Sequence, residues 1–105
     1  MLIDIVESPV KSKRFRATIR VKGGTLKYVD FGYAAGKTYI DHGDEKLRDL
    51  YRARHINNIK ERAAIQNLAA TPATLSYYLL WGDSKSLGDN VRALNKLWAD
   101  KYGEK

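Results

Sequence analysis

The sequence contains no cysteine and only two prolines. Without cysteine the chain has no disulfide, no thiolate metal ligand and no cysteine nucleophile, and nothing in it argues for an oxidising compartment. The prolines, Pro9 and Pro72, are isolated, and neither an internal repeat nor a low-complexity tract divides the chain. We therefore expect one domain over residues 1–105, working inside a cell or in a virion.

Long apolar runs are also missing. Near the start, Leu2-Ile3 and Ile5-Val6 are interrupted by Asp4, which leaves them far below the roughly 20 apolar residues of a membrane span. The same segment lacks the basic region and the cleavage site of a signal peptide. The sequence thus predicts neither membrane insertion nor export, and we expect no membrane partner.

Acidic residues are outnumbered, with 12 Asp and Glu against 19 Lys and Arg, and the formal net charge is +7. Such a surface attracts polyanions, because nucleic acids and acidic surfaces release counterions when Lys and Arg approach. The alternative is that the charge only keeps a small domain soluble. Composition does not decide between the two, so the positions of the charges must.

Residues 13–21 alternate with period two, which is typical of a half-buried strand. Its apolar side comprises Phe15, Ala17, Ile19 and Val21. Its cationic side comprises Arg14, Arg16, Arg20 and Lys22. Gly23-Gly24 predicts a tight hairpin turn, and residues 25–32 predict the returning strand, with Val29 and Phe31 facing inward. Residues 2–6 are available as a third strand.

The glycine-rich stretch 32–43 is interpreted as a loop. Asp44 then predicts the N-cap of a helix that places Leu47, Leu50, Tyr51 and Arg54 on one face and Arg48, Arg52 and His55 on another. After a break at Asn57-Asn58, residues 59–69 predict a second helix. Thr71-Pro72 begins an apolar helix, the expected buried centre, which ends at Gly82.

A last amphipathic helix follows a cap at Ser86, with an apolar stripe of Leu87, Val91, Leu94 and Trp98. Trp81 and Trp98 occupy core-type positions and are interpreted as packing residues. The sequence therefore predicts an α+β fold, in which an N-terminal antiparallel hairpin, with a possible third strand, packs against three to four C-terminal helices.

The cationic side of the first hairpin strand is the main candidate site. Alternate residues of a strand stand about 6.6 Å apart, so its basic residues would form a row. Tyr28 on the neighbouring strand would offer a stacking surface to a base, and the first helix would add phosphate contacts. The predicted nucleic-acid site is Arg14, Arg16, Arg20, Lys22, Tyr28, Arg48 and Arg52. The alternative is a solvated strand face that discourages edge aggregation.

Both histidines lie near carboxylates. A metal-dependent nuclease would use Asp41, His42 and Asp44 as ligands or general base, and His55 as an acid. Their spacing matches no known template. The alternative is that Asp41 and Asp44 cap the helix while His55 lies near its negative end. We therefore expect no catalytic residue, no metal and no cofactor, and the protein is predicted not to be an enzyme.

Several short blocks of the sequence have a recognisable pattern. They are Phe31-Gly32, residues 38–42, Arg54-His55, residues 75–82 and Ser86-Leu87. Together they resemble a family of small basic proteins encoded by large DNA viruses of algae and protists. The resemblance extends from Lys11 to Trp98, and its most specific part is the Ser-Tyr-Tyr-Leu-Leu-Trp block. It implies a viral source without an assigned activity. Arginine often stands where Tyr77 is, so the resemblance gives Tyr77 no role.

Three hypotheses follow. The first is a viral accessory protein that binds nucleic acid and catalyses nothing. The second is a virion structural protein, a minor capsid or cementing subunit, whose charges meet an acidic capsid surface and whose hairpin edge pairs with a neighbour. The third and weakest is the metal-dependent nuclease.

Overall fold

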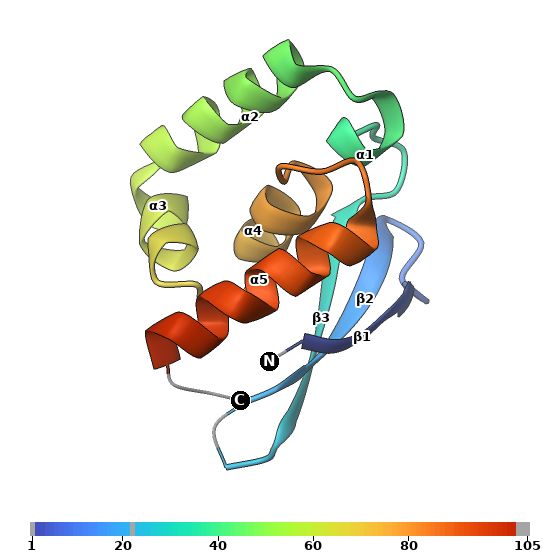
Figure 1. The fold of residues 1–105 in the computed structure, drawn as a ribbon. Coiled ribbons are helices and arrows are strands. Elements are labelled where there is room, and N and C mark those ends of the chain that lie inside the picture. The colour runs from blue at the N-terminus through green and yellow to red at the C-terminus, as the bar shows by residue number, and fades with distance from the viewer. Residues whose placement is uncertain (1, 22, 103–105) are drawn as a thin grey trace.

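The computed structural model describes residues 2–21 and 23–102, and Figure 1 shows their fold. Three strands come first, namely β1 (Leu2–Glu7), β2 (Lys13–Arg20) and β3 (Leu26–Tyr33). The helices follow as α1 (Tyr39–His42), α2 (Glu45–Asn57), α3 (Ile59–Gln66), α4 (Pro72–Leu75), the π-helix η1 (Ser76–Leu80) and α5 (Leu87–Tyr102). The predicted α+β fold is confirmed, with the third strand. No helix in the described ranges is long and apolar enough to cross a membrane.

The strands form one antiparallel sheet in the order β1-β2-β3. Ala17 pairs with Ile5 on one side and with Val29 on the other, and all three belong to the apolar core or pack against it. Gly23 and Gly24 make the hairpin turn with φ angles of 91° and 84°. These values favour glycine because a Cβ atom is strained there, so the turn predicted from this pair is confirmed.

Helices cover one face of the sheet and leave the other face open (Figure 1). The core between sheet and helices includes Phe31, Leu75, Leu79, Leu80, Leu94 and Trp98. The indole Nε1 of Trp98 donates a hydrogen bond of 2.7 Å to the carbonyl of Leu68. The segment after Thr71-Pro72 is therefore the buried centre, as its apolar sequence predicts, and Trp98 is a core residue.

Local capping signals placed most helix starts correctly. The Asp44 carboxylate accepts a hydrogen bond from the Leu47 amide at 3.1 Å, and the Thr71 hydroxyl accepts one from the Thr74 amide at 3.3 Å. Asn58 separates α2 from α3 and caps the second of them. The predicted end of α3 at Ala69 is wrong, since the helix ends at Gln66.

The interpretation of residues 32–43 as a loop throughout is also wrong. The segment contains the short helix α1, which Thr38 and Asp41 stabilise through a reciprocal capping box. The helix ends at Gly43, whose φ angle is 67°. Asp41 is in turn held by Arg14 on β2, a contact between distant parts of the chain that local sequence does not reveal.

Candidate nucleic-acid interface

Arg14 does not extend as a lone cation from the sheet. Its guanidinium donates two hydrogen bonds to the Asp41 carboxylate, at 2.7 and 2.6 Å, and a third to the Thr38 hydroxyl at 3.3 Å. The Arg14 guanidinium, together with the Thr38 amide and hydroxyl, holds the pKa of Asp41 well below its usual range. Arg14 therefore fixes α1 to the end of the sheet.

Arg16 is paired in a similar way on the open face. It donates to both oxygens of Asp30, its cross-strand neighbour, at 2.9 and 3.0 Å. The Ser8 hydroxyl donates to the same carboxylate at 3.0 Å. The hydrogen bond from Arg16 lowers the pKa of Asp30, and the same contact raises the pKa of Arg16. The predicted cationic row is thus interrupted by a neutralised pair.

Another member of the predicted row, Arg20, is exposed at the end of β2, toward the hairpin turn. Lys22 lies outside the described residues. Tyr28 pairs with Thr18, so it shares the open face with Arg16, and it is 62% exposed. The prediction that Tyr28 faces the same way as the cationic side is confirmed.

The two arginines predicted on the first helix point toward the protein. The Arg48 guanidinium lies 4.6 Å from the centre of the Tyr39 ring, and its side chain is only 14% exposed. Arg52 donates to the Trp81 carbonyl at 2.7 Å and to the Asp83 carboxylate at 3.0 Å. Both residues hold α2 in place and leave little of their charge to solvent.

Helix α2 also lies far from the open face of the sheet. It packs on α1 and α3, while α4 and η1 contact β3 and separate α2 from the sheet (Figure 1). The sheet and helix cations therefore do not share one face, and the continuous surface that would combine them is not formed.

The proposed metal ligands are engaged elsewhere. Asp41 is bound by Arg14, the ring nitrogen Nδ1 of His42 accepts a hydrogen bond of 2.9 Å from the Asp44 amide, and Asp44 caps α2. Within residues 2–21 and 23–102, no three His, Asp or Glu side chains are arranged to hold a metal ion. The capping interpretation is correct for Asp44, whereas Asp41 caps α1 and not α2. The nuclease hypothesis loses its ligand set.

His55 belongs to an aromatic stack that fixes α2. The Tyr51 ring lies between the Trp81 indole, at 4.4 Å, and the His55 imidazole, at 4.0 Å. His55 Nδ1 pairs with the Glu61 carboxylate on α3, and His42 lies on the other side of Trp81 at 5.5 Å. Trp81 is therefore a packing residue, as predicted, but it packs in this stack at the edge of the core.

The sequence interpretation missed a basic cluster where β2 begins and β3 ends. Lys13 pairs across the strands with Tyr33, which is 70% exposed. The Ala34 amide donates to the Ser12 carbonyl at 3.2 Å, so the turn between β1 and β2 lies beside the turn that follows β3. A shallow groove here is formed mainly by residues 7–15, which include Lys11, Lys13 and the acidic Glu7, and Ala34 completes its lining.

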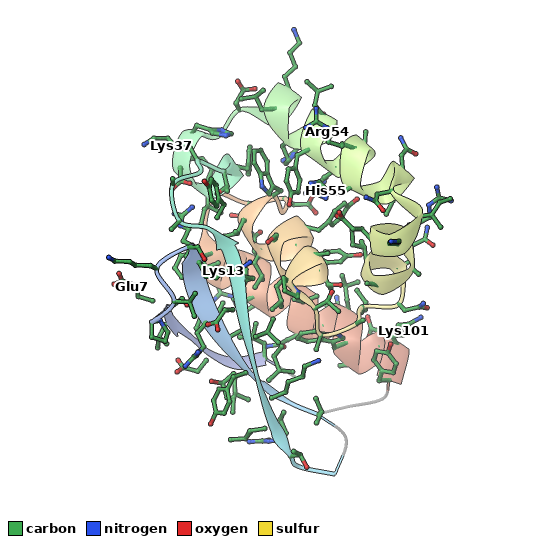
Figure 2. The ribbon with its side chains drawn as sticks, turned by 180° about the vertical axis from the view of Figure 1, so that it is seen from behind. Glu7, Lys13, Lys37, Arg54, His55 and Lys101 are labelled. Carbon is green, nitrogen blue, oxygen red and sulfur yellow. The ribbon has the colours of Figure 1, made fainter. Side chains whose placement is uncertain are left out.

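Lys37 lies farther along the same side of the molecule, and Figure 2 labels it together with Lys13 and the acidic Glu7. Lys11, Lys13 and Lys37 are exposed, and none of them forms a salt bridge within the ranges 2–21 and 23–102. We call Lys11, Lys13, Tyr33 and Lys37 the lysine–tyrosine end. Strand alternation places Tyr33 on the same inward side as Phe31, so the sequence did not indicate that its ring is exposed. Only the neighbouring lysines indicated a basic surface here.

The fold and its surface define a small basic α+β domain with one open sheet face and an exposed lysine–tyrosine end. The chain belongs to DUF5754, a family of unknown function, whose sequence pattern matches residues 3–55. It is also 31% identical over 81 residues to an uncharacterised protein of Acanthamoeba polyphaga mimivirus, an alignment that covers 75% of this chain and 80% of the relative. No solved structure matches the chain.

These matches confirm the expected kinship with an uncharacterised family that has a viral member. The family pattern ends before residues 75–82. The special weight given to the Ser-Tyr-Tyr-Leu-Leu-Trp block therefore stays a prediction.

Proposed function

We propose that the protein is a viral accessory protein that binds single-stranded nucleic acid through its lysine–tyrosine end and catalyses no reaction. The observation that carries this proposal is the exposed ring of Tyr33, which pairs across the strands with Lys13, together with Lys11 and Lys37, since none of these three lysines forms a salt bridge among the described residues. Such lysines attract phosphates, and their binding releases the counterions condensed on the nucleic acid. An exposed aromatic ring stacks on an unpaired base of any sequence.

The β3 edge of the sheet separates this site from the open face. Tyr28 and Tyr33 lie on the same strand, β3, about 16 Å apart by the strand rise, and their separation of five residues places them on opposite faces of the sheet. Arg20 is exposed toward the hairpin end of the neighbouring strand. A nucleic-acid strand that stacks on both tyrosines would therefore have to cross the β3 edge of the sheet. Stacking needs unpaired bases, which favours single-stranded over duplex ligands.

The paired arginines have a different role in this proposal. Arg14 and Arg16 already donate to carboxylates, so a phosphate would have to compete with Asp41 or Asp30 for the same nitrogens. We infer that these arginines position the site, and that the lysines make the direct contacts.

The test is fluorescence-anisotropy binding to short single- and double-stranded oligonucleotides. The site variant is Lys11→Ala/Lys13→Ala/Lys37→Ala. The matched control, Lys46→Ala/Lys60→Ala/Lys96→Ala, removes the same charge from exposed lysines on the helices. The proposal requires the site variant to lose affinity for single strands and the control to keep most of it. Equal losses in both would mean that only net charge matters.

A second candidate, the virion structural subunit, is favoured by one observation. The outward side of α2 exposes Leu47 and Leu50, and exposed aliphatic side chains are more typical of protein contacts than of nucleic-acid contacts. Stoichiometric presence of the protein in purified particles would favour this candidate, and its absence from them would exclude it.

A further inference from the structure

Helix α2 is attached to the protein by its polar side. None of its residues is buried, and the side chains that contact the rest of the fold are those of Arg48, Tyr51, Arg52 and His55. Leu50, which is 65% exposed, lies on the opposite side. Leu47, which is 47% exposed, lies at the border of that side, one turn before Tyr51. This is the reverse of an ordinary amphipathic surface helix, whose aliphatic side faces the core.

Positive charges flank the exposed leucines. Lys46 precedes Leu47, and Arg54 lies one turn beyond Leu50 on the same side of the helix. Neither cation forms a salt bridge in the part of the chain that the structure describes. The acidic residues of α2 are Glu45 and Asp49, and both contact Arg48.

A further exposed aliphatic residue follows the end of α2. Ile59, the first residue of α3, is 80% exposed. Lys60 follows it and is exposed as well. Exposed aliphatic residues next to a lysine therefore occur at the start of α2 and again at the start of α3.

We propose that the outward side of α2, formed by Lys46, Leu47, Leu50 and Arg54, binds an acidic amphipathic helix of another protein. Leucines on such a helix would cover Leu47 and Leu50 by ordinary ridge-and-groove packing. Glutamates beside them would pair with Lys46 and Arg54. A second copy of this chain fits poorly, because both copies carry a formal charge of +7 and the same cations would meet. The inference does not depend on nucleic-acid binding.

The probe is a fluorescein-labelled synthetic peptide of about 20 residues, built from Glu, Ala and Leu with leucines at i, i+3, i+4 and i+7. A second peptide has Lys in place of every Glu. Binding of each to the full-length protein is followed by anisotropy. The protein variants are Leu50→Ser and Lys46→Glu/Arg54→Glu, which change only exposed side chains and should leave the fold intact.

Matched controls come from α5. Leu97 is 41% exposed, and Lys96 precedes it as Lys46 precedes Leu47. The controls are therefore Leu97→Ser and Lys96→Glu. Circular dichroism of every variant confirms that it is folded.

The proposal predicts saturable binding of the Glu peptide alone, weakened at least about tenfold by Leu50→Ser and unaffected by either control. The variant Lys46→Glu/Arg54→Glu should bind the Lys peptide in preference to the Glu peptide. Absence of binding to the Glu peptide, equal binding of both peptides, or equal effects of Leu97→Ser and Leu50→Ser would overturn it. The proposal would also be overturned if neither peptide bound and the α2 variants instead lost binding to oligonucleotides or anionic vesicles. The variant Lys11→Ala/Lys13→Ala/Lys37→Ala should still bind the Glu peptide, whether or not it binds oligonucleotides.

Discussion

The Tyr51 ring lies almost parallel to the Trp81 indole, with ring centroids 4.4 Å apart and planes inclined by 9°. This contact joins α2 to the end of η1, and His55 covers the other side of the tyrosine at 4.0 Å. Burial raises the pKa of Tyr51 to about 12. The stack explains how a helix without a buried residue is nevertheless fixed in orientation.

The raised pKa of Tyr51 predicts a loss of stability at alkaline pH. A tyrosine whose pKa is raised by folding contributes its full stabilisation below the unfolded value of about 10. That contribution is lost as the pH rises from about 10 to the folded value of about 12. Burial raises the pKa of Tyr78 as well, in the same direction. Melting temperatures followed by circular dichroism should therefore fall above pH 10, and Tyr51→Phe should make that fall shallower.

Tyr28→Phe is the matched control for this experiment, since Tyr28 is 62% exposed on the open sheet face. It should leave the alkaline profile as in the wild type. A Tyr51→Phe protein with an unchanged profile would show that Tyr51 ionises as freely in the folded chain as in the unfolded one.

The Arg14–Asp41 pair predicts a loss of stability in acid. The pKa of Asp41 is lowered, chiefly by Arg14, so its contribution is present above the unfolded value of about 3.9 and is lost as the pH falls below it. At neutral pH, Asp41→Asn should lower the free energy of unfolding by about 2 kcal/mol, because a charge-assisted pair and a cap are weakened together. Urea unfolding between pH 3 and 7 checks this.

Asp100→Asn on α5 provides the comparison for Asp41→Asn, because Asp100 is exposed. Its effect should stay within about 0.5 kcal/mol, as is usual for a surface substitution. If the two variants had the same stability at pH 7, the pair would not hold α1 to the sheet.

Two glycines near the start of α5 should respond oppositely to alanine. A Cβ atom at Gly82 would lie 2.2 Å from the Tyr78 carbonyl oxygen and 2.8 Å from the Asn90 side chain. We expect Gly82→Ala to cost more than about 3 kcal/mol, since backbone and a buried amide would have to move. At Gly88 the nearest atoms are 3.7 Å away, so Gly88→Ala should be neutral or stabilise the helix by up to about 1 kcal/mol. Equilibrium urea unfolding of both variants measures the two changes in the free energy of unfolding. Similar changes in the two variants would contradict the packing described around Gly82.

The parts of the fold that local sequence controls could be predicted. The Gly23-Gly24 turn, the period-two pattern of β2 and the caps at Asp44 and Thr71 each act within a few residues, and the structure confirms them. Helix α1 was missed because four residues are too few to show a helical period; its Thr38–Asp41 capping box and Gly43 are local signals, whereas the contact of Asp41 with Arg14 joins distant parts of the sequence. Long-range contacts of this kind leave no periodic signal.

The candidate site was harder to predict for the same reason. Charge counting identified Arg14 and Arg16 as basic, but it did not reveal that Asp41 and Asp30 fold against them. The faces of α2 were separated only in part, because Tyr51, predicted on the face of the two leucines, packs inward together with Arg48, Arg52 and His55. The Tyr51–Trp81 stack thus outweighs the usual inward preference of leucine. Exposure of Tyr33 depends on where the helical cover of the sheet ends.

The central claim is that the lysine–tyrosine end binds single-stranded nucleic acid, and the salt dependence of binding tests it most directly. For three lysine–phosphate contacts, the slope of log K against log salt concentration should be about −2.1 on a single strand. Lys11→Ala/Lys13→Ala/Lys37→Ala should remove most of that slope, and Lys46→Ala/Lys60→Ala/Lys96→Ala should retain it. Tyr33→Ala should weaken binding by about 1–3 kcal/mol without changing the slope. An unchanged slope in the first variant, or an equal loss in the second, would contradict the account.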